Sequence, residues 1–591
     1  MTDLEKLQKE MQKLKIENAN LKKKKKFGLV WEEREREQDI DDGEYYPYLV
    51  KKSNDFGRDN GDSNKNILIE GDNYHALEIL NYTHKSKINI IYIDPPYNTG
   101  KKREFRYGDR WIDENDGYKH SYWLSFMNKR LQLAKTLMAK EGVIFISIDD
   151  HEFAHLKLLC DDIFRPQNFI GCLPTIMNLK GNNDDFGFSG THEYTMVYAR
   201  NKEYCEFNQF DLDDDELNTW KEDEHGLYKK SDGLKRTGQD APREKRPKGW
   251  FPVFISLTED RVYVTDNNMP LCSEDIILYP INNEGKELSW SWGKDKITKE
   301  YYNLIITGNI KNGFGITKKQ RPQLGDLPTK KPKSIFYKPE YSTSTATNKL
   351  KEMFGEKVFA SPKPVALLKD FIFLASKKDS IILDFFAGSG TSAQAILELN
   401  QEDGGNRKFI LCTNNENNIC EEVTSKRIGK VINGYCVTKP RTKNKSEQII
   451  EVAGIDSNLE YLKLETLKYD DKKHSELDIK DFMVDKLLEI LKVKEMCFSL
   501  ERVSDFLYKF NKEDKDVYIL LNIYSMSKKD YEDVKELLEQ SSKYIINVYI
   551  LALQNHTHYE NKLSDINKQI IFEPLPENFL KLLRKIQRKK R

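Results

Sequence analysis

The amino-acid sequence predicts an α/β protein in which an inserted domain interrupts a doubly wound parallel sheet. Short apolar strands alternate with amphipathic helices over residues 66–200, and the alternation resumes at Ser361. Strands that alternate with helices are typical of a parallel sheet covered by helices on both faces. Residues 201–345 break the alternation with short strands, charged blocks and many Gly and Pro residues.

The elements before the interruption start with an apolar segment. Asn66–Asp72 is expected to form a strand and a turn, because three apolar residues precede Glu-Gly-Asp. The elements that follow are, in order, a helix at Asn73–Leu80, a strand at Ile90–Ile93, a helix at His120–Lys140, a strand at Val143–Ile148, a helix at Glu152–Phe164 and a strand at Tyr194–Tyr198.

After the interruption, predicted helices and strands again alternate. Pro364 is compatible with the start of a helix, because the N–H that proline lacks would have no partner in the first turn. The predicted elements are a helix at Lys363–Ala375, a strand at Ile381–Phe385, a glycine turn, a helix at Ser392–Leu399 and a strand at Phe409–Cys412. We therefore expect both halves to build one sheet.

The two ends of the chain differ from this α/β region. Apolar residues from Leu4 to Leu21 recur at spacings of three and four, with Asn18 on the same seam. This pattern indicates either a coiled-coil helix that self-associates or a helix that docks on its own domain. Residues 445–591 predict a small α/β domain. Its strands are expected at Val517–Ile523, Tyr544–Leu553 and Gln569–Phe572, and its helices at Lys528–Gln540 and Pro576–Ile586.

The predicted domains follow from these boundaries. They are an N-terminal helix at 1–26, the first half of the α/β domain at 27–200, an inserted domain at 201–345, the second half at 346–440, and a C-terminal α/β domain at 441–591 for oligomerisation or partner binding.

The charge of the chain is balanced overall and uneven locally. Lys and Arg number 95, as do Asp and Glu, but residues 205–224 carry nine acids and one base. Residues 226–250 carry eight bases and three acids, and residues 311–338 carry eight bases and one acid. Such basic segments are compatible with phosphate binding, although solvated surfaces have the same composition. Several aromatic residues of the insert look exposed: Trp220, Trp250, Trp290, Trp292, Tyr301 and Tyr302.

Composition also argues against several classes of protein. Mean hydropathy is −0.71, and no apolar run approaches the ~20 residues of a membrane span. The N-terminus has no apolar signal region. The eight Cys residues include no Cys-x-x-Cys pair, so neither a disulfide framework nor a zinc site is indicated. We therefore expect a cytoplasmic protein with no metal site and no membrane partner.

The clearest indication of chemistry lies in the segment Ile90–Gly100. Asp94 follows the predicted strand, and Pro95 and Pro96 stiffen the backbone after it by fixing φ. A carboxylate and a rigid carbonyl can both accept hydrogen bonds from an exocyclic NH₂ group, and Tyr97 can stack on the base that carries it. The same residues would also suit a tight turn. Asp-Pro-Pro-Tyr after an apolar strand favours a site for an aromatic amine.

A second loop, Asp384–Thr391, follows a strand and opens a helix. Gly388 and Gly390 allow a ligand to approach the backbone, and the start of the helix offers free N–H groups. The spacing to Ala393 also fits a dinucleotide fingerprint, so NAD is one interpretation of this loop alone. Glu416 follows the next strand and could bind ribose hydroxyls. NAD chemistry has no use for Asp-Pro-Pro-Tyr, whereas a methyl donor with a nucleoside and a sulfonium would use both loops.

These two loops, in this order, resemble the β-class, permuted, amino-methylating DNA methyltransferases. In that class the catalytic half precedes the cofactor half, and a target-recognition domain lies between them in a Rossmann-like methyltransferase fold. Other segments resemble the modification (Mod) subunit of type III restriction–modification systems: Phe27–Glu32, Gly71–Asn73, Tyr122–Met127, Phe145–Asp150 and Thr413–Glu416. The resemblance covers about residues 27–435 and is weak over the insert.

The resemblance implies a role for each matching residue. Asp94 and Pro95 would accept hydrogen bonds from the target amine, with Pro96 in the same catalytic loop. Tyr97, Asn98 and Tyr194 would form the pocket for the target base, although Tyr194 is equally well explained as a core aromatic. The residues implied to bind S-adenosylmethionine are Asp72, Lys363, Asp384, Phe386, Gly388, Gly390, Thr391 and Glu416.

The implied activity is methylation of adenine N6 in double-stranded DNA, with the base flipped out of the duplex. Cytosine N4 is an alternative acceptor. A different alternative is a specificity subunit that only binds DNA. The implied partners are double-stranded DNA, a second copy of the chain in a homodimer, and a possible ATP-dependent restriction (Res) subunit.

Overall fold

The computed structural model describes most of the chain, which forms two compact units. The first unit comprises the described residues up to 208 and from 333 onward, and the second comprises residues 209–332. The described residues are 30–32, 45–52, 65–100, 106–107, 110–111, 115–178, 180–181, 187–322, 328–439, 448–468, 476–510, 512, 515–521, 526–550, 563, 565–576 and 579. The predicted N-terminal seam and most of the helix predicted at Pro576–Ile586 lie outside them.

The larger sheet of the first unit has nine strands in the order β1-β22-β2-β19-β18-β3-β6-β8-β7. Its strands are β1 (Tyr45–Lys51), β2 (Asn66–Glu70), β3 (Ile88–Ile93), β6 (Met138–Ile148), β7 (Phe169–Ile176), β8 (His192–Ala199), β18 (Ile381–Asp384), β19 (Lys408–Thr413) and β22 (Leu459–Lys468). Neighbours from β22 to β6 pair in parallel, whereas β1, β8 and β7 pair antiparallel. Because β18 lies between β3 and β19, the two halves of the sequence share one sheet.

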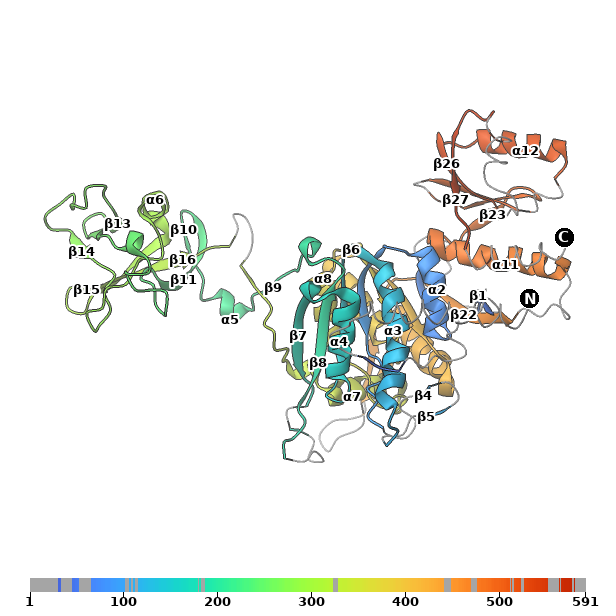
Figure 1. Ribbon diagram of the computed structural model, residues 1–591, viewed down its shortest axis with the longest axis horizontal. Helices are drawn as coiled ribbons and strands as arrows, with labels where there is room; N and C mark the ends of the chain where they lie inside the picture. The colour runs from blue at the N-terminus through green and yellow to red at the C-terminus, as the bar shows by residue number, and fades with distance from the viewer. Residues whose placement is uncertain are drawn as a thin grey trace, which may run out of the picture. The chain divides into compact units, whose positions relative to one another are not determined.

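Helices cover both faces of this sheet. Helices α2 (Asn73–Thr83), α3 (Lys119–Leu137) and α4 (Phe153–Phe164) lie side by side on one face (Figure 1). Ile144 and Ile146 of β6 belong to the same buried cluster as Trp123 of α3. Phe145, between them, stacks on Phe371 of α8 (Val365–Ala375) at 5.1 Å. Successive side chains of a strand point to opposite faces, so each face has its own buried layer.

Three further helices and a hairpin accompany α8. Helix α9 (Thr391–Asp403) packs on α8, and α10 (Ser425–Asn433) packs on α9. Helix α7 (Thr343–Phe354) packs on β20 (Tyr435–Lys439), which pairs with β21 (Gln448–Val452). A short hairpin of β4 (Arg106–Tyr107) and β5 (Arg110–Trp111) precedes α3. Among the described residues, no helix has the length and apolar character needed to cross a membrane.

The sheet also takes up β22, which comes from the segment predicted as a separate C-terminal domain. Charged residues alternate with its apolar residues, so the sequence does not show it as a buried strand. In the structure Glu460 is only 1% exposed and pairs with Lys51 at 3.1 Å and Lys65 at 3.2 Å. These ion pairs allow the carboxylate to be buried within the sheet. Helix α11 (Glu476–Glu495) follows and packs on β1 and α2.

A smaller mixed sheet follows α11. Its strand order is β23-β24-β25-β26-β27, and α12 (Lys528–Glu539) begins with a capping box at Ser527. The strands are β23 (Leu500–Arg502), β24 (Leu507–Phe510), β25 (Asp516–Leu520), β26 (Ile545–Ile550) and β27 (Gln569–Glu573). The last three lie where the sequence predicts strands.

The second unit, residues 209–332, is built from short antiparallel sheets. Their orders are β10-β11-β16-β15, β13-β12-β14 and β17-β9. The elements are β9 (Phe210–Asp211), α5 (Asp214–Leu217), β10 (Lys221–Asp223), β11 (Gly226–Gly233), β12 (Val253–Ser256), β13 (Arg261–Tyr263), β14 (Ile276–Leu278), α6 (Lys294–Lys299), β15 (Leu304–Asn309), β16 (Gly313–Gln320) and β17 (Thr329–Lys330).

Two side chains explain how this unit is held together. The impression that Trp290 is exposed is wrong, because its ring is 6% exposed in the core and its indole N–H donates to the Phe251 carbonyl at 2.9 Å. Asp223 joins the acidic and basic segments through Lys319 and Arg321, each at 2.6 Å. The Arg321 hydrogen bond, with help from Lys319, holds the pKa of Asp223 well below its usual range.

Asp384 connects the end of β18 to α9. Its side chain is buried, Oδ1 accepts a hydrogen bond from the Phe386 N–H at 3.0 Å, and Oδ2 accepts one from the Ser392 hydroxyl. Burial raises the pKa of Asp384 to about 7, although both hydrogen bonds oppose the shift. Asp384 therefore remains largely protonated at mildly acidic pH in the folded protein.

This pKa predicts a pH-dependent contribution to stability. The pKa of Asp384 is about 7 in the folded protein and 3.8 in the unfolded chain. The stability that Asp384 contributes is therefore fully present below pH 3.8 and is lost as the pH rises through about 7. In Asp384→Asn the side chain cannot ionise, so its unfolding free energy should fall less steeply between about pH 4 and about pH 7. Urea unfolding at several pH values measures how the unfolding free energy of wild type and of Asp384→Asn changes with pH. Asp379→Asn, at an exposed position, is the control, and equal slopes for Asp384→Asn and wild type would refute the assignment.

Candidate active site

The loop that we call the Asp94 loop, residues 94–98, begins where β3 ends and is anchored at two points. Trp123 of α3 is fully buried and donates its indole N–H to the Pro96 carbonyl at 2.7 Å. Asn98 is 1% exposed, has φ +58°, and donates its amide to Glu152 Oε1 at 2.6 Å and to the Lys119 carbonyl at 3.2 Å. Both anchors hold the backbone around Tyr97 in one conformation.

Four side chains, Asp94, Tyr97, Glu193 and Lys363, meet at this loop. The Tyr97 hydroxyl lies 2.9 Å from Asp94 Oδ1 and 3.1 Å from Glu193 Oε2, and it accepts a hydrogen bond from Lys363 Nζ at 2.6 Å. Lys363 also donates to both oxygens of Glu193, at 2.6 and 2.8 Å, and lies 3.3 Å from Asp94 Oδ1. We call these four residues the Tyr97 network.

The Tyr97 network carries two carboxylates and one ammonium group. Burial lowers the pKa of Lys363, but the charges of Asp94 and Glu193 outweigh it, so the pKa lies above its ordinary value. Burial raises the pKa of Glu193 against the opposing effect of Lys363. Burial, reinforced by both carboxylates, raises the pKa of Tyr97 well above its usual value, so its hydroxyl remains a donor. When both carboxylates are ionised, the network has an excess negative charge that can stabilise a positive charge developing beside it.

Asp94 retains one oxygen for a ligand. Within the part of the chain that the structure describes, Asp94 Oδ2 makes no hydrogen bond, and the side chain is 28% exposed. A cavity of about 540 Å³ lies beside the loop and is lined by residues that include Tyr97, Asp150, Asn178 and Glu193. Its volume is in the range of small-molecule sites. The cavity is therefore large enough for a planar base beside Tyr97, but Asp94 is not among the residues that line it.

The glycine loop, residues 384–391, adopts a conformation that requires glycine. Gly388 and Gly390 have φ of +49° and +76°, in the left-handed region that side chains disfavour. A Cβ at Gly390 would lie 3.1 Å from Thr424 Cγ2, and one at Gly388 would lie 3.4 Å from the Phe359 ring. The Thr424 hydroxyl donates to the Gly388 carbonyl at 2.5 Å. This close packing on Thr424 and Phe359, together with the positive φ, accounts for glycine at both positions.

Arg427 of α10 supports the glycine loop. Its guanidinium is 4% exposed and donates to the hydroxyl oxygens of Ser389 at 3.0 Å and Thr391 at 2.8 Å, and to Gln394 Oε1 at 2.9 Å. Burial lowers the pKa of Arg427 to about 10, so it stays charged. The hydroxyl of Thr391, a predicted cofactor residue, is thus engaged within the protein.

Helix α2 joins the glycine loop from the other side. Asp72 is its N-cap and accepts a hydrogen bond from the Tyr74 N–H at 2.8 Å. Arg130, which is fully buried, donates to Asn73 Oδ1 at 2.6 Å and lies 3.4 Å from Asp72. Asn73 in turn donates to the Phe385 carbonyl at 2.9 Å, next to Phe386 of the glycine loop. The Asp72 side chain remains 32% exposed, as a ligand contact requires.

The predicted cofactor residue Glu416 is exposed and follows the end of β19. The Asp94 loop, the glycine loop and Glu416 therefore lie at the carboxyl ends of three adjacent parallel strands, β3, β18 and β19. Ligands of open α/β sheets bind at this edge. The structure thus brings the two predicted loops together, although Gly388 and Asp94 are far apart in sequence.

The remaining predicted residues have other surroundings. Lys363, expected beside the cofactor, contacts Tyr97 and Glu193 in the structure. Tyr194 is half-buried, with its ring centroid 4.5 Å from Phe153 and 5.1 Å from His192. Asn98, expected in the base pocket, is engaged by Glu152.

Sequence reasoning did not find Glu193. It precedes Tyr194 on β8, and neighbouring side chains of a strand point to opposite faces. Either Glu193 or Tyr194, but not both, can therefore point toward Tyr97. In the structure it is Glu193. The fold was needed to choose, because nothing in the local sequence indicates which face of β8 meets the Asp94 loop.

This geometry agrees with the similarity of the chain to known proteins. Residues 88–468 match the family model described as DNA methylase. The chain is 53% identical over 378 residues to the Mod subunit of the type III restriction–modification enzyme EcoPI of Escherichia phage P1, and the alignment covers 60% of this chain and 58% of that subunit.

Two further relatives are more distant. The type II methyltransferase M.KpnI of Klebsiella pneumoniae is 33% identical over 354 residues, which cover 60% of this chain and 82% of M.KpnI. The Mod subunit of the type III enzyme StyLTI of Salmonella typhimurium is 32% identical over 416 residues, which cover 64% and 59%. The chain thus spans about three fifths of the length of the two Mod subunits. On the extent of the family match, the chain belongs to the DNA methylase family.

Proposed function

We propose that the chain is a site-specific DNA methyltransferase that transfers a methyl group from S-adenosylmethionine to adenine N6 in double-stranded DNA. The observation that carries this proposal is the available Asp94 Oδ2 beside Tyr97, at the same sheet edge as the glycine loop. One loop suits an aromatic amine, and the other suits a cofactor with an extended backbone contact.

The glycine loop fits the proposed cofactor. Gly388 and Gly390 adopt positive φ where β18 leads into α9, and the N–H groups at the start of this helix would meet a polar group of the cofactor. Asp72, Phe386 and Glu416 would line the nucleoside, as the family resemblance implies. Bound S-adenosylmethionine would supply an electrophilic methyl group on a positively charged sulfur.

The Asp94 loop would prepare the amine for attack. The lone pair of the amine nitrogen is delocalised into the base. Hydrogen bonds from this amine to Asp94 Oδ2 and to the Pro95 carbonyl would favour a geometry in which the lone pair is free. The nitrogen would then bond to the methyl carbon as the carbon–sulfur bond breaks, leaving the electron pair on the sulfur of the departing thioether, and the amine would release its proton to the Asp94 carboxylate or to solvent. The negative charge of the Tyr97 network would stabilise the positive charge on the nitrogen.

An amine inside a duplex is out of reach of this loop, so the base would have to flip into the cavity of about 540 Å³ and stack on Tyr97. Residues 201–345, which contain the compact unit 209–332, would select the DNA sequence. In that unit the Arg243 guanidinium lies 4.7 Å from the Trp250 ring, which stacks on Tyr279 at 5.2 Å. Arginine and aromatic rings of this kind are common in nucleic-acid contacts.

The proposal extends to the biological assembly. Similarity to the EcoPI and StyLTI Mod subunits supports a role as the modification subunit of a type III restriction–modification system, with a Res subunit as partner in the cytoplasm. The predicted seam Leu4–Leu21 and the C-terminal segment would support a homodimer.

A paired substitution tests the division of labour between the two loops. Asp94→Ala should lower single-turnover methyl transfer by about 10²–10³-fold, because it removes an oriented acceptor, and should leave cofactor affinity nearly unchanged. Gly390→Val should abolish cofactor binding, because its side chain clashes with Thr424 at a positive φ. Calorimetric titration with S-adenosylmethionine and product analysis by mass spectrometry measure both effects.

Gly404→Val is the matched control for backbone strain. Gly404 has φ +67°, but a Cβ there would meet nothing within 4 Å, so its cofactor affinity should be retained. Near-normal transfer by Asp94→Ala, or equal loss of cofactor affinity in Asp94→Ala and Gly390→Val, would disprove the assignment. N4-methylcytosine as the product would select the alternative acceptor.

The insert gives a second prediction. Replacing residues 201–345 by the corresponding segment of another Mod subunit should move methylation to the recognition site of the donor, because the two catalytic loops lie outside the exchanged segment. Sequencing of methylated DNA identifies the site. A folded, active hybrid that still methylates the original site would show that sequence choice resides elsewhere.

A further inference from the structure

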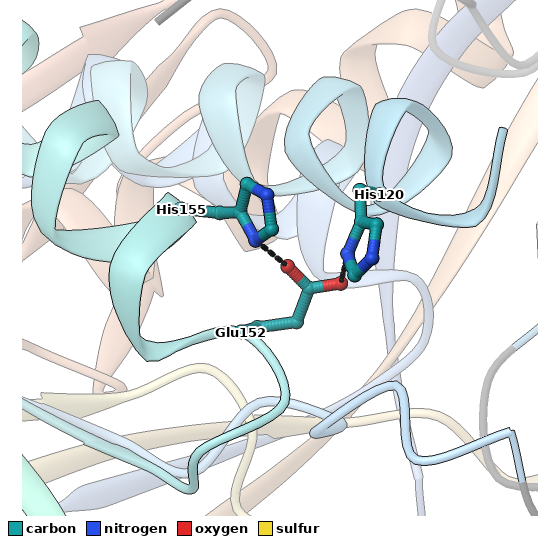
Figure 2. A group of neighbouring side chains, drawn as sticks. All are labelled: His120, Glu152 and His155. Carbon is teal, nitrogen blue, oxygen red and sulfur yellow. Dashed lines mark hydrogen bonds and ion pairs between the residues drawn. The ribbon is translucent and has the colours of Figure 1, made fainter.

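A second group of chemically active side chains lies outside the Tyr97 network. Among the described residues, His120, Glu152 and His155 are the three that could together hold a metal ion (Figure 2). His120 lies in the first turn of α3, Glu152 directly precedes α4, and His155 lies in the first turn of α4. Figure 2 shows both imidazole rings turned toward the carboxylate between them.

The distances between these atoms suit one small cation. His120 Nδ1 lies 2.7 Å from Glu152 Oε1, and His155 Nδ1 lies 3.0 Å from Glu152 Oε2. All the ligand atoms lie within 4.8 Å of one another. Zinc binds His nitrogen and carboxylate oxygen at about 2.0–2.2 Å, so two ligands of one tetrahedral ion are about 3.3 Å apart. Small side-chain rotations would therefore admit an ion between the three groups.

The burial of the carboxylate supports a positive partner. Glu152 is 0% exposed, and Oε2 makes no hydrogen bond of good geometry with the described residues, despite its distance from His155. A buried carboxylate is costly unless it is paired or bound to a metal. The side chains of His120 and His155 are 40% and 33% exposed, so solvent and ions can reach the group.

The donor set selects the class of ion. Two imidazole nitrogens and one carboxylate favour zinc and similar transition metals, whereas magnesium and calcium prefer oxygen ligands. Metal-binding carboxylates are usually also hydrogen-bonded to a residue behind them. Asn98 has this position, because its amide donates to Glu152 Oε1 at 2.6 Å.

We propose that His120, Glu152 and His155 form a binding site for one divalent transition-metal ion of the zinc class. The ion joins the starts of α3 and α4 and fixes the carboxylate that anchors Asn98, next to Tyr97. The site is structural and acts on the position of the Asp94 loop. The absence of a Cys-x-x-Cys pair predicts no metal site, and these ligands leave no local pattern in the sequence, since His120 and Glu152 are 32 residues apart.

To test the site, a chelator first removes bound metal from the untagged, full-length chain, which is then titrated with Co²⁺. Visible absorption of protein-bound Co²⁺ should saturate at one equivalent, and Zn²⁺ should displace it. His120→Gln and His155→Gln should each weaken binding at least about 10-fold, because each removes a direct ligand, and second-sphere changes alone cost 10–100-fold. The double variant should not bind at one equivalent.

His75→Gln is the matched control. His75 Nδ1 lies 3.0 Å from Glu78 Oε2 at the same three-residue spacing as His155 and Glu152, but this pair is not part of a three-ligand group among the described residues. The control should bind Co²⁺ with wild-type affinity.

Thermal unfolding gives an independent measure of metal binding, because it compares the Tm of each protein with and without Zn²⁺. Zn²⁺ should raise the Tm of wild type and of His75→Gln by linkage, and should leave the Tm of the double variant unchanged. Circular dichroism verifies that each variant is folded. Absence of saturable binding to wild type, or equal binding to the double variant, would overturn the proposal and leave a hydrogen-bonded cluster only.

Discussion

Parallel pairing of β18 with β3 and β19 is the constraint on which the rest of the first unit depends. Ile382 pairs with Ile90 and with Phe409, so one short strand joins the two halves of the chain. The pairing brings the Asp94 loop and the glycine loop to the same edge of the sheet. In the proposed site neither loop would suffice alone, because the Asp94 loop would accept hydrogen bonds from the amine and the glycine loop would hold the cofactor.

The Tyr97 network sets the charge at this edge of the sheet. Lys363 comes from the segment before α8 and Glu193 from β8, and both meet Tyr97 from outside its own loop. When both carboxylates are ionised, the lysine compensates one of them and leaves an excess negative charge, which would favour the cationic reaction centre of the proposed methyl transfer.

Sequence patterns predict the parts of the fold that are set locally. Asp94 and Gly390 are predicted as site residues because a strand end followed by a proline pair, and a Gly-x-Gly turn before a helix, leave signatures in the local sequence. Glu193 and the contacts of Lys363 depend on which strands become neighbours, so no local pattern reveals them. The same reason explains β22, whose buried Glu460 is acceptable only beside Lys51 and Lys65, and Trp290, whose core is assembled from distant short strands.

The central place of β18 also sets the order of assembly during translation. The Ile381 N–H donates to the side chain of Asn89, which lies 292 residues earlier. At about 5–20 residues per second, the ribosome needs roughly 15–60 s to synthesise that interval. During this time one edge of β3 has no partner, and β1 and β2 also wait, because in the described sheet they pair only with later strands. Unpaired strand edges promote aggregation, so the nascent first half has exposed edges until β18, β19 and β22 have all emerged.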